Sequence, residues 1–214
     1  MNVTIWSDFV CPFCYIGEAH LAKALAELDF GDQVEIEYKS FLLNPEATYV
    51  EGKNYLESLS DEKGMPIEQA KEMTQRVVDM AQSAGLTIDF EQAKNAPTQD
   101  AHRVFQYAKE QGKGTQFFAR FYKAFFTEGE NLGEADAIVR LAKEVGLEEG
   151  AVRSILASQD YQEAFHADIQ QAQMIGVQGV PFFVLANKYA VSGAQPTELF
   201  KQALTQAWQE QEEA

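Results

Sequence analysis

The chain has two cysteines, and they lie three positions apart in the run Cys11-Pro12-Phe13-Cys14. Two cysteines placed at random in a chain of this length would fall at this spacing in roughly one arrangement in a hundred, so the spacing calls for a chemical reason. Two thiols at this spacing can form a disulfide with each other and exchange it with a partner molecule. We therefore interpret Cys11 and Cys14 as a candidate redox-active pair.

The residues around the pair predict a strand that ends shortly before it and a helix that begins at it. The run Val3–Trp6 is typical of a strand, and Pro12 suits the first position of a helix, where its missing N–H costs nothing. The unpaired N–H groups that begin a helix favour a thiolate at Cys11. Cys14 follows about one turn later on the same side. We expect Cys11 to be the nucleophile and Cys14 to resolve the mixed disulfide.

Two other interpretations of the pair are open. A Cys-x-x-Cys pair can be half of a zinc site, but the chain has no second such pair, and His20, His102 and His166 are far apart in the sequence. The spacing therefore disfavours zinc, and we predict no metal and no resident cofactor. Two inert buried thiols are the other interpretation, which the position of Pro12 at a helix start disfavours.

The charge balance narrows the range of partners. The chain carries 33 acidic and 17 basic residues, a formal net charge of −16, which argues against nucleic acid or an anionic membrane as a partner. No stretch approaches the roughly 18 apolar residues that a membrane-spanning helix needs. The first residues lack the basic and apolar regions of an export signal, so we expect a cytoplasmic protein. The sequence does not predict the oligomeric state.

Hydrophobic periodicity predicts an α/β protein with a long helical middle section. A helix over about 12–28 is followed by alternation at Val34, Ile36 and Tyr38, which completes a strand-helix-strand unit. Strands return at 181–185 and 189–192, followed by a helix that begins at Pro196. Between these two parts the pattern is helical, with helices predicted over 67–84, 98–113, 115–127, 134–145, 148–158 and 161–175. We expect one domain from residues 1–50 and 177–214, and a helical insertion over 51–176.

Three segments resemble known proteins. They are residues 7–17 (SDFVCPFCYIG), 176–184 (GVQGVPFFV) and 192–195 (SGAQ). Together they resemble the thioredoxin superfamily with a helical insertion as in the DsbA family, and within it the FrnE-like oxidoreductases. The resemblance implies a thioredoxin-like α/β fold (β-α-β … β-β-α) with a large all-helical insertion.

The resemblance also implies roles for residues outside the cysteine pair. It implies a cis peptide bond between Val180 and Pro181 that faces the cysteines, with the Val180 backbone pairing to an extended substrate or to glutathione. We count Pro181 with the catalytic residues, and Pro12, Phe13 and Val180 with the substrate-binding ones. From the residues alone, an ordinary trans strand that begins at Pro181 is favoured, because cis peptide bonds are rare.

The expected function is thiol-disulfide exchange with protein or small-molecule thiols and disulfides, and glutathione is a possible co-substrate. One alternative is a glutathione-dependent transferase or an enzyme similar to 2-hydroxychromene-2-carboxylate isomerase, relatives that typically carry serine at the position of Cys11. Cysteine at both ends of the motif favours exchange. An alternative of another class is a non-catalytic redox sensor or binding module.

Two further features have a structural and a functional interpretation. Six aromatic residues between Phe117 and Phe126 fall at helical spacing and could line a groove, although core packing is the favoured interpretation. Asp8, three residues before Cys11, could relay a proton, but we favour a capping or loop-stabilising role.

Overall fold

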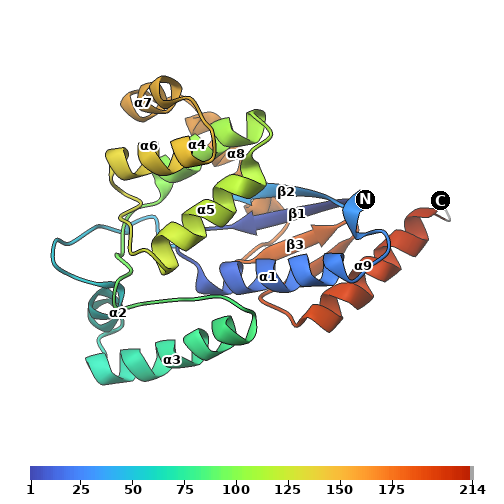
Figure 1. The fold of residues 1–214 in the computed structure, drawn as a ribbon, viewed down its shortest axis with the longest axis horizontal. Coiled ribbons are helices and arrows are strands. Elements are labelled where there is room, and N and C mark those ends of the chain that lie inside the picture. The colour runs from blue at the N-terminus through green and yellow to red at the C-terminus, as the bar shows by residue number, and fades with distance from the viewer. Residues whose placement is uncertain (213–214) are drawn as a thin grey trace. The chain divides into compact units, whose positions relative to one another are not determined.

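The computed structural model describes residues 1–212 and contains a four-stranded mixed sheet (Figure 1). Strand β1 (Asn2–Ser7) pairs in parallel with β2 (Glu35–Ser40) and antiparallel with β3 (Phe182–Leu185). Strand β4 (Tyr189–Ser192) pairs antiparallel with β3, so the strand order is β2-β1-β3-β4. All four strands lie close to the positions at which the sequence predicted them.

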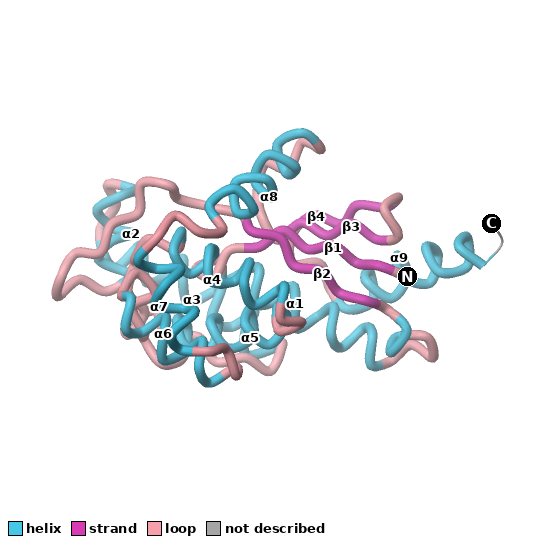
Figure 2. Tube along the Cα trace, turned by 90° about the horizontal axis from the view of Figure 1, so that it is seen from above, coloured by secondary structure: helices cyan, strands magenta, loops and turns pink. Residues whose placement is uncertain are grey.

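Helices cover both faces of the sheet because successive side chains of its strands point to opposite sides. Helix α1 (Pro12–Ala26) and helix α9 (Thr197–Glu212) pack together, and Phe183 of β3 meets Phe200 of α9 with ring centroids 4.8 Å apart. Helix α8 (Gln162–Met174) lies along the opposite face (Figure 2). There Trp6 packs against Ala172, in the last part of α8, and against Val177. A short 3-10 helix, η1 (Gly31–Gln33), leads from α1 to β2.

The chain divides into two compact units. One consists of residues 1–43 and the chain from Asp168 onward, and it contains the sheet and both cysteines. The other, Asn44–Ala167, is the helical section that interrupts it. The sequence analysis set the insertion at 51–176, whereas the compact helical unit begins and ends earlier in the chain. The helices of this unit before α8 are α2 (Tyr55–Lys63), α3 (Ile67–Ser83), α4 (Gln99–Glu110), α5 (Gly114–Phe126), α6 (Ala135–Glu144) and α7 (Glu149–Ala157).

The aromatic residues of α5 form the core of the helical unit. Rings of α4 and α5 meet there, with Phe105 4.7 Å from Phe118 and Phe117 3.9 Å from Phe121 between centroids. All six aromatic residues of the band are fully buried: Phe117, Phe118, Phe121, Tyr122, Phe125 and Phe126. The core interpretation is therefore confirmed, since a ring without exposed surface cannot line an open groove.

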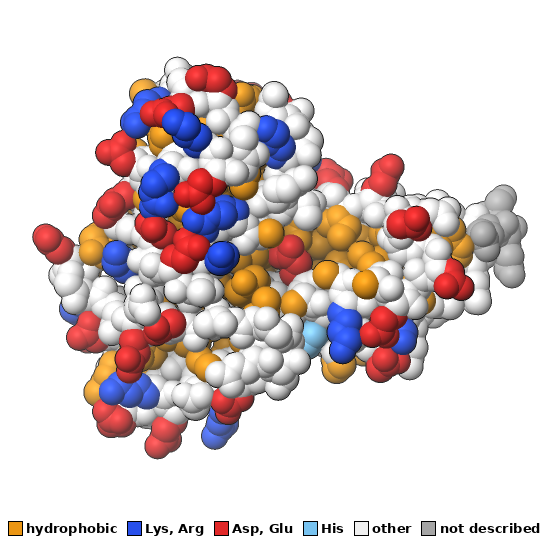
Figure 3. Space-filling view, in the orientation of Figure 1, with side chains coloured by type: hydrophobic (Ala, Val, Ile, Leu, Met, Phe, Trp, Pro, Cys, Tyr) orange, Lys and Arg blue, Asp and Glu red, His pale blue; other side chains and the backbone are white. Residues whose placement is uncertain are grey.

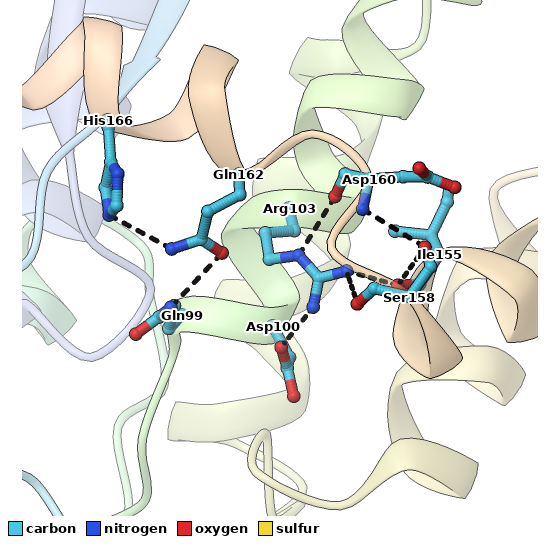
Figure 4. A network of polar contacts seen from close by, with 8 residues as sticks. All are labelled: Gln99, Asp100, Arg103, Ile155, Ser158, Asp160, Gln162 and His166. Atoms are coloured by element: carbon cyan, nitrogen blue, oxygen red, sulfur yellow. Dashed lines mark hydrogen bonds and ion pairs between the residues drawn. The ribbon is translucent and has the colours of Figure 1, made fainter.

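A buried arginine joins α4 to the end of α7 in the same unit (Figure 4). Arg103 donates from Nε to the carbonyl of Asp160 at 3.0 Å and from Nη2 to the carbonyls of Ser158, at 2.7 Å, and of Ile155. Its Nη1 pairs with Asp100 at 2.9 Å. The guanidinium therefore holds the carbonyls at and just beyond the end of α7 against α4.

Helix α2 was not predicted as a separate helix, because it is short and buries only Leu56. Its start nevertheless has a local signal: Asn54 accepts from the Glu57 N–H at 3.0 Å, and Glu57 accepts from the Asn54 N–H at 2.9 Å. This reciprocal capping box satisfies N–H groups that the helix itself leaves open. Gly64 ends the helix at a φ of 60°, which glycine adopts with little strain.

Charged side chains of both signs are interspersed on the face shown in Figure 3. Over the helical unit they form ion pairs such as Arg120 with Glu144 at 2.6 Å and Arg153 with Asp136 at 2.9 Å. Exposed pairs of this kind contribute at most about 1 kcal/mol each, so they matter more for solubility than for stability. In the part of the chain that is described, no helix combines the length and the apolar character needed to cross a bilayer.

Candidate active site

Cys11 lies at the start of α1 and caps it with its own sulfur. Its backbone is extended (φ −89°, ψ 108°), and its Sγ accepts the N–H of Cys14 at 3.2 Å. Pro12 occupies the first helical position, as predicted. Negative charge on an acceptor at this position is stabilised, because the free N–H groups and the positive end of the helix dipole point toward the acceptor. The local geometry therefore places the Cys11 sulfur at the N-terminal end of α1, next to the N–H groups of its first turn.

Cys14 lies one turn further into the helix, and the closest approach between the two cysteines is 2.9 Å. Both thiols are free, and both residues are buried, with 2% of Cys11 and 1% of Cys14 exposed. Burial raises the pKa of the Cys14 thiol well above its usual value, and the adjacent Cys11 sulfur raises it further. Cys14 is thus held as a neutral thiol beside the capping sulfur.

The loop before β3 brings a backbone carbonyl to Cys11. The thiol of Cys11 donates to the carbonyl of Val180 at 3.5 Å, and the Val180–Pro181 peptide bond is cis. Gly17 of α1 lies directly behind this loop, where a Cβ atom would stand 3.1 Å from Cγ of Pro181 and 3.3 Å from the Cα of Ala194. Because Gly17 has no side chain, α1 can approach both this loop and the loop after β4 that contains Ala194.

Asp8 organises the loop that leads from β1 into α1. Its carbonyl accepts the N–H of Cys11 at 3.1 Å, and its Oδ2 accepts the N–H of Leu43 at 2.9 Å. The side chain is fully buried. These contacts are the loop-stabilising ones that we favoured over a proton relay.

The two residues between the cysteines differ in exposure. Phe13 has 42% of its surface exposed, whereas Pro12 is half-buried and both flanking cysteines are almost inaccessible. An exposed aromatic ring next to a buried sulfur is a suitable contact for an apolar substrate segment. The role of Pro12, Phe13 and Val180 in binding stays a prediction.

The sequence analysis missed two titratable residues near the cysteines, Glu18 and Tyr38. Glu18 follows Cys14 by four residues on α1, and Tyr38 lies in β2 with only 3% of its surface exposed. Burial raises the pKa of Glu18 to about 7, and the Tyr38 hydroxyl, which interacts with the carboxylate, opposes that rise. The i to i+4 spacing from Cys14 is the sequence signal that could have identified Glu18.

The histidines do not converge on the cysteines. His20 Nδ1 lies 2.8 Å from the carbonyl of Gln195, His166 Nε2 lies 3.0 Å from Gln162, and His102 is buried in α4. Among residues 1–212, no group of three or more His, Cys, Asp or Glu side chains is placed to hold a metal ion.

The structure has the strand order β2-β1-β3-β4, a Cys-x-x-Cys pair at the start of α1, and a β3–β4 hairpin followed by α9. Together these features define a thioredoxin fold. Comparison with protein families agrees with this class. Residues 2–205 match the DSBA-like thioredoxin domain. The chain therefore belongs to the DSBA-like thioredoxin domain family, and the predicted fold is confirmed.

Three relatives extend the comparison. The uncharacterized protein YwbO of Bacillus subtilis is 30% identical over 207 residues, which cover 96% of each chain. The crystal structure of the probable DsbA oxidoreductase SCO1869 from Streptomyces coelicolor is 38% identical, with a TM-score of 0.91 over 98% of this chain and 91% of that one. A 2-hydroxychromene-2-carboxylate isomerase shares the fold, with a TM-score of 0.74 over 100% of this chain and 98% of that one, at 17% identity.

Proposed function

We propose that the protein is a thiol-disulfide oxidoreductase in which Cys11 is the nucleophile and Cys14 the resolving thiol. The observation that carries the proposal is the position of the Cys11 sulfur, which caps α1 by accepting the Cys14 N–H at 3.2 Å. A sulfur in this position is stabilised as an anion, and the thiolate is the reactive form of cysteine. The similarity to SCO1869 supports the same class of activity.

The proposed reaction has two exchange steps. The thiolate of Cys11 attacks one sulfur of a substrate disulfide, a mixed disulfide forms, and the other substrate sulfur leaves as a thiolate. The thiolate of Cys14 then attacks Cys11, the Cys11–substrate bond breaks, and the second substrate sulfur leaves. The protein ends with a Cys11–Cys14 disulfide, and the substrate ends as two thiols. The reverse sequence oxidises a substrate dithiol, and the surrounding thiol pool decides the direction.

Substrates in this proposal are protein or small-molecule disulfides, and glutathione serves as a co-substrate that restores the reduced pair. The Val180 backbone would pair with an extended segment, while Pro12 and Phe13 contact its side chains. The FrnE-like subtype and a cytoplasmic location belong to the same proposal. A reducing compartment fits the proposal, since a dithiol pair must be reduced to attack a disulfide.

The glutathione transferase or isomerase alternative has less support. Relatives with that chemistry typically carry serine at the position of Cys11, and the likeness to the isomerase at 17% identity concerns the fold alone. A non-catalytic redox sensor is the alternative of another class. The sensor would form the same reversible Cys11–Cys14 disulfide, but it would not turn over a disulfide substrate.

Turnover of a fluorescently quenched disulfide peptide in a glutathione buffer separates these functions. We expect turnover by the wild-type protein, none above background by Cys11→Ser, and a large loss in Cys14→Ser. Serine is a good helix cap, so Cys11→Ser keeps the start of α1 while removing the nucleophile. Full activity of Cys14→Ser in glutathione conjugation would support the transferase instead, and background rates for the wild type would support the sensor.

A further inference from the structure

His20 and the loop 193–196, which joins β4 to α9, have no role in the steps above, yet they are bonded to each other. His20 lies on α1 and is half-buried. Its Nδ1 lies 2.8 Å from the carbonyl oxygen of Gln195, across a sequence separation of 175 residues. A carbonyl oxygen can only accept a hydrogen bond, so the histidine ring carries a proton on Nδ1 and donates it.

The loop 193–196 is held in one shape by its own hydrogen bonds. The N–H of Gln195 donates to the carbonyl of Gly193 at 2.9 Å, and the side-chain amide of Gln195 donates to the carbonyl of Ser192 at 2.8 Å. Gly193 has a φ of 80°, which glycine adopts with little strain. The bond from His20 therefore fixes the position of the whole turn.

The same loop is bonded to the segment that faces Cys11. The N–H of Gly193 donates to the carbonyl of Pro181 at 2.9 Å, and this bond extends the β3–β4 ladder beyond its last residue pair. The preceding carbonyl, that of Val180, accepts the thiol of Cys11 at 3.5 Å. A continuous series of contacts therefore leads from His20, through the loop 193–196, to the backbone beside the cysteine.

Helix α1 also contacts both segments at Gly17, one helical turn before His20. A Cβ atom at Gly17 would lie 3.1 Å from Cγ of Pro181 and 3.3 Å from Cα of Ala194. Gly17 allows this close approach, but it has no side-chain group that could hold the loop in place. The hydrogen bond of His20 supplies a directional contact on the same face of the helix.

We propose that His20 is a positioning residue for peptide disulfides, because its Nδ1–H anchors the loop 193–196 and so keeps the Val180 backbone in place beside Cys11. The inference rests on the proposed exchange function, in which an extended substrate pairs with Val180. Placement of the substrate sulfur relative to Cys11 sets the rate of attack. A small disulfide without a peptide backbone does not use this pairing. His20 therefore affects the reaction with peptides and leaves the reactivity of the cysteine pair unchanged.

Turnover of two disulfides in a glutathione buffer tests the inference. One is the fluorescently quenched peptide, and the other is 2-hydroxyethyl disulfide. For His20→Ala we expect kcat/KM for the peptide to fall about 3- to 10-fold, chiefly through a higher KM, as for the loss of one hydrogen bond. The rate with 2-hydroxyethyl disulfide should equal that of the wild type, which also shows that the variant folds. His166→Ala, the same change at an exposed position of α8, should match the wild type with both disulfides.

His20→Asn separates the hydrogen bond from the stability of α1. The amide nitrogen of asparagine is bonded to Cγ, as Nδ1 of histidine is, so it can donate to Gln195 from the same position. Asparagine is a poorer helix former than alanine, so a loss caused by a weaker helix would be larger in His20→Asn than in His20→Ala. We expect the reverse, with kcat/KM for the peptide restored toward the wild-type value.

Three kinetic results would overturn the inference and leave the exchange function intact. They are an equal loss with both disulfides in His20→Ala, no loss with either, and a His20→Asn protein no better than His20→Ala. Nitrogen-15 chemical shifts of the neutral His20 ring give an independent result: a proton on Nδ1 supports the anchor, and a proton on Nε2 overturns it. A wild type that reduces neither disulfide would instead contradict the exchange function itself, on which the inference rests.

Discussion

At the scale of single residues, Cys11 and Cys14 differ little in exposure. They are distinguished by their hydrogen-bond and electrostatic partners. Cys11 receives the Cys14 N–H at the start of α1, whereas burial and the neighbouring sulfur hold Cys14 protonated. The asymmetry that nucleophile and resolving thiol require therefore comes from hydrogen bonding and electrostatics. Exposure does not distinguish the two thiols, since 2% of Cys11 and 1% of Cys14 are exposed.

Glu18 also predicts a pH dependence of stability. Its pKa is about 7 in the folded chain against an ordinary value of 4.5, so between these pH values the folded state binds a proton that the unfolded state does not. The stability that this provides is full below about pH 4.5 and is lost as pH rises through about 7. The change in the free energy of unfolding amounts to at most about 3.4 kcal/mol.

Urea unfolding of wild type and Glu18→Gln from pH 4.5 to 8 measures this effect. We expect the wild type to lose stability relative to the variant as pH rises, because glutamine never becomes charged. Parallel stability curves for the two proteins would show that Glu18 keeps an ordinary pKa.

At the scale of elements, two loops pack against α1: the loop before β3, which contains Pro181, and the loop after β4, which contains Ala194. Gly17 permits this contact, since a Cβ there would also lie 3.3 Å from Cζ of Phe183. The neighbours are a proline ring, a backbone Cα and a buried aromatic ring. None of these is the mobile end of a flexible side chain.

Gly17→Ala should therefore destabilise the protein. Overpacking typically lowers the free energy of unfolding by about 1–3 kcal/mol, and the better helix propensity of alanine offsets at most about 1 kcal/mol of this loss. Gly114→Ala is the matched control in α5, because a Cβ there would be at an ordinary 3.4 Å from Phe105. We expect a lower urea midpoint for Gly17→Ala only. Equal midpoints would show that the loops shift without cost.

Most of the helices and strands could be predicted from the sequence. Apolar alternation and apolar runs predicted the four strands, and a period of 3.6 residues predicted most helices, because each element buries apolar side chains. Helix α2 was missed because its burial pattern is weak, although Asn54 and Glu57 carry a capping signal. The pairing of Glu18 with Tyr38 could not be predicted, since it depends on how α1 lies over β2.

At the scale of the whole molecule, the net charge of −16 acts on every charged substrate that approaches. The field does not select a fold, but it changes encounter rates with charged small molecules. Salt screens such a field, with a Debye length of about 30 Å at 0.01 M and about 8 Å at 0.15 M ionic strength.

The rate of reaction with small disulfides should therefore depend on their charge. We expect added salt to slow the reaction with cationic cystamine, to accelerate that with anionic oxidised glutathione, and to leave neutral 2-hydroxyethyl disulfide unchanged. Stopped-flow rates over this range of ionic strength measure the effect. The same salt response for all three disulfides would mean that the acidic surface does not influence the cysteines.

The most direct test of the account is to map the intermediate. Cys14→Ser should accumulate a mixed disulfide when it is mixed with an oxidised protein substrate, because nothing displaces the captured partner. Peptide mass spectrometry should place that bond on Cys11, and the wild type under the same conditions should yield the Cys11–Cys14 disulfide. A Cys14→Ser protein that captures no partner, or a Cys11→Ser protein that captures it equally well through Cys14, would contradict the assignment.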